Sequence, residues 1–115
     1  MSLAHYEEIV EEGTDNGRRT EKMAISHSLD LLETAQETGV QSSEATIAMH
    51  FTRRLWEMLL RDLASPENGL PAQLRADLIS IGIGILRELE ELRQQRKEDF
   101  GHVMFLSRTI LGGLQ

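Results

Sequence analysis

Apolar residues recur every three or four positions along most of this chain, which is the spacing of amphipathic helices. They predict one helix over residues 20–38, which Gly39 ends, and a second over 44–64, which Ser42 or Ser43 caps. The second helix carries the larger apolar face, with Phe51, Leu55 and Leu59 on it. The segment "SPENGLP" then holds both prolines and marks a turn.

The stretch "LISIGIGIL", residues 78–86, alternates isoleucine with small residues, as a half-buried strand does. A helical spacing nevertheless covers more sequence, and no other segment offers a strand that would pair with an isolated one. We therefore predict a third helix over 71–98, with Pro71 at its first position. Its apolar stripe is made by Leu74, Leu78, Ile81, Ile85, Leu89 and Leu92.

A short fourth helix is predicted over 100–112, with Asp99 as its cap and Gly112 and Gly113 as its stop. The predicted fold class is therefore all-α, a small bundle of about four helices. A chain of 115 residues suits one domain. We expect an acidic, solvated N-terminal arm over residues 1–17 and a single helical domain over 18–115.

Two glycines, Gly82 and Gly84, lie inside the third predicted helix, where each costs roughly 1 kcal/mol relative to alanine. If the third helix packs antiparallel on the second, Gly82 comes close to Leu55 and Trp56. We therefore expect Gly82 to lie in the contact between these two helices, opposite a bulky side chain.

The formal net charge of −7 is concentrated at the start, because residues 1–17 hold five acidic residues and neither lysine nor arginine. The rest of the chain offers no basic stripe, so we expect no direct binding of nucleic acid. No apolar run is long enough to span a membrane, the start lacks the features of a signal peptide, and cysteine is absent. We expect a cytoplasmic protein without membrane association.

Residues with catalytic chemistry form no recognisable motif. The four histidines lie in separate segments, and no glycine-rich loop or nucleophile elbow is present. Glu88, Glu90 and Arg93 fit a charged helix face better than an acid–base pair. We therefore expect neither an enzyme nor a bound metal or cofactor.

Residues 51–86, "FTRRLWEMLLRDLASPENGLPAQLRADLISIGIGIL", resemble the core of the FlaF flagellar biosynthesis regulators of alphaproteobacteria. The resemblance is carried by "RRLW", "DLASPENGLP" and "LRADLISIG", and it extends more loosely from about Tyr6 to "ILGGL". The chain departs from the family pattern after "ISIG", where a bulky aromatic residue is frequent and this chain has Ile83 and Gly84.

The resemblance implies a non-enzymatic cytoplasmic protein that is required for flagellin production and export and binds flagellin in a chaperone-like way. It also implies an association with FlbT, which acts post-transcriptionally on flagellin messages. The alternatives are a post-transcriptional regulator acting with FlbT on flagellin mRNA and a structural adaptor between flagellar proteins. A homodimer is also compatible with the sequence.

A second apolar stripe on the third helix, made by Ile79, Ile83 and Leu86, is the candidate partner-binding surface. Its alternative role is the centre of the bundle. Trp56 is either a core anchor or part of the partner surface. Asp62, Arg75 and Asp77 are expected to form a polar network that joins the second and third helices, and a partner site is the alternative. The residues to which we assign a structural role in the family-like motif are Arg54, Leu55, Asp62, Asn68, Leu70, Pro71, Arg75, Asp77 and Gly82.

Overall fold

The computed structural model describes residues 14–113, and this part of the chain is an all-α bundle. Its helices are α2 (Thr14–Thr38), α3 (Ser43–Ala64), α4 (Ala72–Arg93) and α5 (Gly101–Gly113). The predicted fold class is confirmed, and residues 79–85 are helical. Residues 1–13 of the expected acidic arm lie outside the described residues, whereas residues 14–17 already belong to α2.

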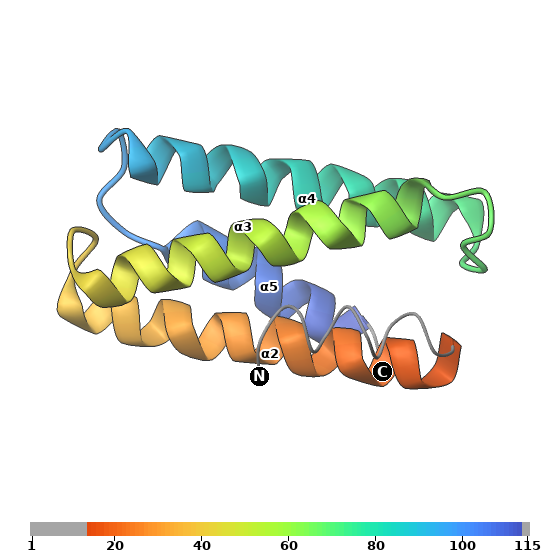
Figure 1. Cartoon of the computed structure of the whole chain (residues 1–115). Coiled ribbons are helices and arrows are strands. Elements are labelled where there is room, and N and C mark those ends of the chain that lie inside the picture. The colour runs from red at the N-terminus through yellow and green to blue at the C-terminus, as the bar shows by residue number, and fades with distance from the viewer. Residues whose placement is uncertain (1–13, 114–115) are drawn as a thin grey trace.

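The helices run alternately up and down, and each packs against two others (Figure 1). α2 contacts α3 and α5, and α4 contacts the same two helices, so the four surround a shared core. In Figure 1, α5 lies behind the other helices and runs from the end of α4 toward α2. The result is a bundle of 38 × 27 × 22 Å.

The turn between α2 and α3 follows the expected signals. Gly39 has a φ of 105°, which a residue without a Cβ adopts easily, and its N–H donates to the carbonyl of Ala35 at 2.8 Å. The Ser42 hydroxyl accepts the N–H of Ala45 at 3.1 Å and so caps α3. These two residues explain why α2 and α3 are separate helices.

Two predicted helix limits are wrong. α2 begins at Thr14 instead of residue 20, and α4 ends at Arg93 instead of residue 98. The chain leaves α4 because Gln95 adopts a φ of 61°, after which the N–H of Arg96 donates to the carbonyl of Glu91 at 2.8 Å. Glutamine gives no sequence signal for this left-handed C-terminal turn, which is usually made by glycine.

The contact between α3 and α4 is centred on Gly82, as predicted. Gly82 is buried, and a Cβ added there would lie 2.8 Å from Cε3 of Trp56 and 3.0 Å from Cδ2 of Leu60. The glycine therefore admits the indole ring, which is only 1% exposed. Gly84 lies two residues further along the same helix, and a Cβ added there would have no atom within 4 Å.

Burial along the predicted stripe of α4 is uneven. Ile85, Leu89 and Leu92, in the second half of the helix, are buried. Leu78 and Ile81 are half-buried, and Leu74 is 37% exposed. The core beneath the second half is completed by side chains of the other elements, among which the largest are Trp56, Phe100, Ile25, Leu32 and Leu55.

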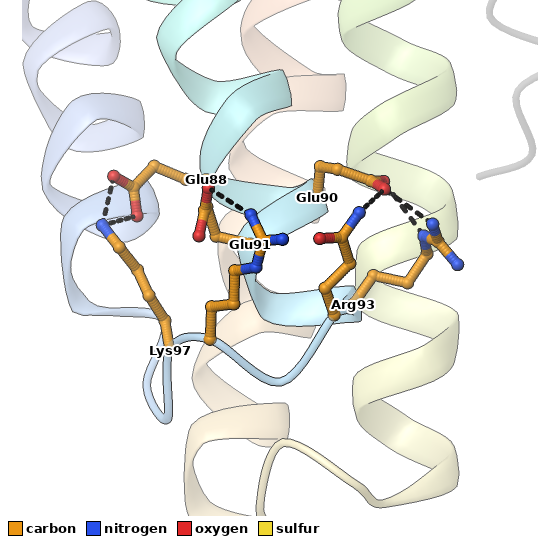
Figure 2. A network of polar contacts seen from close by, with 7 residues as sticks. Glu88, Glu90, Glu91, Arg93 and Lys97 are labelled. Atoms are coloured by element: carbon orange, nitrogen blue, oxygen red, sulfur yellow. Dashed lines mark hydrogen bonds and ion pairs between the residues drawn. The ribbon is translucent and has the colours of Figure 1, made fainter.

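Acidic residues at the end of α4 are each matched by a cation or amide from the last residue of the helix or from the following turn (Figure 2). Lys97 Nζ donates to Glu88 Oε2 at 2.6 Å, Arg93 donates to both oxygens of Glu90, and Arg96 lies 3.8 Å from Glu91. Carboxylates at a helix C-terminus are repelled by the helix dipole, so these partners offset an unfavourable arrangement. They also hold the connection that leads to α5.

Glu88 joins this connection to α5 itself, because His102 Nδ1 lies 3.0 Å from its Oε1. Burial raises the pKa of the Glu88 carboxyl, but hydrogen bonds from Lys97 and His102 outweigh that effect and hold the pKa below its ordinary value of 4.5. The ion pair therefore stabilises the fold at neutral pH, and this contribution is lost as the pH falls through the lowered pKa.

Replacing Gly82 with leucine should lower the free energy of unfolding by about 1 to 3 kcal/mol, because the new side chain overpacks the contact with Trp56. Gly84→Ala is the matched control on the same helix. Its Cβ enters open space, so a gain of up to about 1 kcal/mol is expected from helix propensity. Denaturant unfolding measures both, and a Gly82→Leu variant as stable as the unmodified chain would contradict the packing described.

Replacing Glu88 with glutamine should make thermal stability less dependent on pH between about pH 6 and about pH 3. The variant lacks the carboxylate whose ionised form is favoured in the folded state. The effect should be about 1 kcal/mol or less, since Lys97 is 43% exposed. Glu67→Gln is the control, as Glu67 is exposed and forms no ion pair among the described residues. Equal pH profiles for the two variants would refute the role given to Glu88.

Candidate functional site

A groove of about 470 Å³ lies between the first half of α3 and the second half of α4, beside the turn that joins α2 to α3. Its apolar lining comes from Val40 in that turn, Met49 of α3, and Leu86, Leu89 and Leu92 of α4. The helix pair is in close contact at Gly82, whereas leucines occupy the following positions of α4 that face the groove. The groove therefore opens beside the part of α4 that carries leucines, beyond the close contact at Gly82.

The rim of the groove is charged. His50 and Arg53 line it from α3, and Glu90 and Arg93 line it from α4. Arg93 binds Glu90 through two hydrogen bonds, of 3.0 and 2.6 Å. The hydrogen bond from Arg93 lowers the pKa of Glu90 to about 2, with Gln94 and the positive charge of Arg53 contributing further. At neutral pH the rim therefore combines ionised groups of both signs around an apolar floor.

The structure distributes the predicted partner-binding residues over three environments. Leu86 lines the groove and is half-buried. Ile83, one turn earlier on α4, is 42% exposed, and Ile79 is half-buried; neither lines the groove itself. Trp56 lies in the core beside Gly82 and is therefore inaccessible to a partner in this conformation. Of the two roles expected for Trp56, its burial fits the core anchor and not the partner surface.

Sequence reasoning missed most of the groove. Leu89 and Leu92 are buried in the core, as the stripe predicts, and they also reach the floor of the groove. The sequence does not predict the lining roles of Val40 and Met49. The available signal was weak: Val40 is an apolar residue within a turn, and Met49 lies outside the main apolar stripe of its helix. Their shared location depends on how α3 and α4 pack, which the residue pattern of either helix alone does not reveal.

The polar residues of the family-like motif fix the turn between α3 and α4 but do not form the expected network. Arg75 reaches across the turn and donates to the main-chain carbonyls of Leu63, at 3.0 and 2.8 Å, and Ser65, at 3.1 Å. Asp62 instead accepts from Asn68 at 3.2 Å, and Asp77 accepts from Gln73 at 2.9 Å. The three predicted side chains therefore have separate partners.

Arg75 satisfies carbonyls that the end of α3 leaves without helical partners. Asn68 adds a second tie, because its side chain also donates to the carbonyl of Asp62 and accepts the N–H of Leu70 at 3.0 Å. Pro71 immediately precedes α4. Of the remaining motif residues, Leu55 is fully buried and Arg54 is exposed. Together these contacts set where α4 begins relative to the end of α3.

No group of three histidine, cysteine or acidic side chains suited to a metal ion occurs among residues 14–113. His27 packs edge-on against Phe51, with ring centroids 5.0 Å apart, His50 lies at the groove rim, and His102 pairs with Glu88. His5 lies outside the described residues. Within that same part of the chain, none of the helices combines the length and apolarity needed to cross a bilayer.

Comparison with known proteins identifies the family. The family described as "Flagellar protein FlaF" matches residues 2–114, which is nearly the whole chain. No curated protein and no solved structure matches this chain. The match covers the α3–α4 motif, the groove between these helices and the surrounding bundle. The chain therefore belongs to the FlaF family of flagellar proteins.

Proposed function

We propose that this FlaF protein acts in the cytoplasm as a flagellin-binding, chaperone-like regulator of flagellin production and export. The observation that carries the proposal is the apolar groove between α3 and α4, together with the exposed isoleucine that extends it along α4. Membership of a flagellar family supports the choice of partner class.

The shape and chemistry of the groove suit one amphipathic helix. Leu86, Leu89 and Leu92 span about 9 Å along α4, or somewhat less than two helical turns. A partner helix that presents apolar residues at a spacing of three or four would place two or three of them in such a groove. Outside it, Ile83 offers a further apolar contact.

The charged rim adds orientation to this binding mode. Arg53 and Arg93 lie on opposite walls, and Glu90 is held by Arg93. Rim charges influence register and the rate of encounter more than total affinity. A partner helix with carboxylates beside its apolar stripe would meet Arg53, whose nearest carboxylate, Glu57, is 3.6 Å away and 44% exposed.

The proposed activity is binding without catalysis. By covering an apolar helix face of flagellin, the protein would keep that face from associating with other flagellin molecules before export. A regulator that acts with FlbT on flagellin mRNA is the competing function, and it requires phosphate contacts whose strength falls steeply with salt. An adaptor would need a second partner bound at the same time.

Purified protein and purified flagellin, both free of nucleic acid, should associate in calorimetry with a negative heat-capacity change, because apolar surface is buried. The affinity should change little between about 50 mM and about 200 mM salt, since few phosphate-type contacts are involved. Association only after RNA is added would replace the chaperone proposal with the RNA-directed one. Absence of any association at tens of micromolar would refute flagellin binding.

Ile83→Glu should weaken flagellin binding by about tenfold or more, because the carboxylate must be desolvated against the partner helix. Its melting temperature should stay close to that of the unmodified chain, since Ile83 is 42% exposed. Phe105→Glu is the matched control: Phe105 is 61% exposed but lies on α5, away from the groove. Equal binding by both variants would exclude Ile83 from the binding surface.

A further inference from the structure

One stripe of α4 faces away from the rest of the bundle. It consists of Ala76, Ser80, Ile83 and Arg87, which follow one another at steps of four, three and four residues and are all exposed. On its other sides α4 packs against α3 and α5, and it forms the upper edge of the bundle in Figure 1. We call these four residues the outer stripe of α4.

The outer stripe is apolar near its centre. Ile83 is 42% exposed, and the half-buried Ile79 borders it one turn earlier. Gly84 lies beside Ile83, and a Cβ added there would meet no atom within 4 Å, so no contact within the described part of the chain requires this glycine. A glycine inside a helix lowers the stability of that helix, but it allows a second helix to approach closely. These features suit a helix that packs on this side from outside the bundle.

We propose that the partner is a second copy of this chain, whose α4 packs antiparallel on the outer stripe about a two-fold axis beside residue 82. This residue lies at the middle of α4, which runs from Ala72 to Arg93. The two helices therefore overlap along almost their full length of about 33 Å. Such a contact uses the same surface on both copies and is complete with two of them.

The charges of α4 complement each other in this arrangement. Asp77 and Arg87 each lie five residues from Gly82 in opposite directions, so the axis brings Asp77 of each copy level with Arg87 of the other. Both side chains belong to exposed residues, and neither forms an ion pair within residues 14–113. The interface therefore gains two pairs of opposite charge, which favour this orientation more than they add affinity. A parallel pair in register would instead place each charge beside its like.

The two ends of α4 favour the same direction. Its last turns carry Glu88, Glu90 and Glu91, whereas its first turn has no acidic residue and its N-terminus has no side-chain cap. In the antiparallel pair, Glu91 of one copy is level with Gln73 in the first turn of the other. A carboxylate is stabilised near a helix N-terminus, so Glu91 of each copy gains a favourable interaction with the other helix.

The proposed dimer covers Ile83, which also belongs to the surface proposed for flagellin. A second copy and flagellin therefore compete for α4, and self-association lowers the amount of protein that is free to bind flagellin. This competition rests on the proposed function, whereas self-association itself does not.

Charge reversal followed by mixing tests the dimer in the full-length chain without flagellin. Asp77→Lys alone, or Arg87→Glu alone, should weaken self-association about tenfold, because two pairs of like charge replace the two attractive pairs. When the two variants are mixed, they should form a mixed dimer with about the affinity of the unmodified chain, since it again holds two pairs of opposite charge. Sedimentation equilibrium over a range of protein concentrations measures each dissociation constant.

Arg54→Glu is the matched control, because Arg54 is exposed on α3 and forms no ion pair among the described residues. It should leave the dissociation constant unchanged. Gly84→Leu should separate the two copies, because its side chain fills the space that the second helix needs, while the melting temperature of dilute protein stays close to that of the unmodified chain.

A protein that stays monomeric at every concentration would overturn the proposal, and so would self-association that none of the three α4 substitutions weakens. A mixture of Asp77→Lys and Arg87→Glu that associates no better than either variant alone would also overturn it, because these two residues would then not meet across the interface. Each of these results is obtained without flagellin and is therefore separate from the outcome of the flagellin experiments.

Discussion

The contact between the Trp56 indole and Gly82 determines how α3 and α4 pack. A Cβ at residue 82 would lie 2.8 Å from the ring, so only glycine allows the two helices their present separation at this position. The glycine weakens α4 locally, yet it admits the largest fully buried side chain of the core. The groove beyond it, between Met49 and Leu86, depends on the relative placement of the same two helices.

Arg75, at the turn between α3 and α4, fixes the position of α4 along α3. By donating to Leu63 and Ser65 carbonyls, the guanidinium ties α4 to the end of α3 and satisfies groups that the helix terminus exposes. The turn and the packing contact thus constrain the helix pair at two points. At the far end of α4, the ion pairs of Glu88 with Lys97 and of Glu91 with Arg96 hold the chain as it reverses toward α5.

Elements governed by local spacing were predictable from the sequence. The helical state of residues 78–86 follows from the stripe on both sides of it, and the position of Gly82 opposite Trp56 follows from antiparallel packing about the proline-rich turn. The end of α4 was not predictable, because Gln95 adopts a left-handed conformation that glycine or asparagine normally makes. The polar network failed for a related reason: Arg75 binds main-chain carbonyls, whose positions are not encoded by neighbouring side chains.

The candidate groove was predicted only through Leu86 and the nearby Ile83. Periodicity indicated that α4 has more apolar surface than one neighbour covers, but the division of this surface depends on helix lengths and crossing directions. α5 buries the second half of one stripe and leaves its first half open, while the α2–α3 turn brings Val40 to a separate groove. A single sequence stripe therefore contributes to the core, to the groove and to the exposed surface at different points along the helix.

The relation between Trp56 and Gly82 is best tested by nuclear Overhauser effects in solution. We expect strong effects between the Gly82 Hα protons and the ring protons bonded to Cε3 and Cζ3 of Trp56, because these two carbons lie 2.8 and 3.1 Å from the position that a Cβ of residue 82 would occupy. Absence of these effects in the folded protein, with the indole protons instead contacting solvent or another helix, would contradict the packing on which the groove depends.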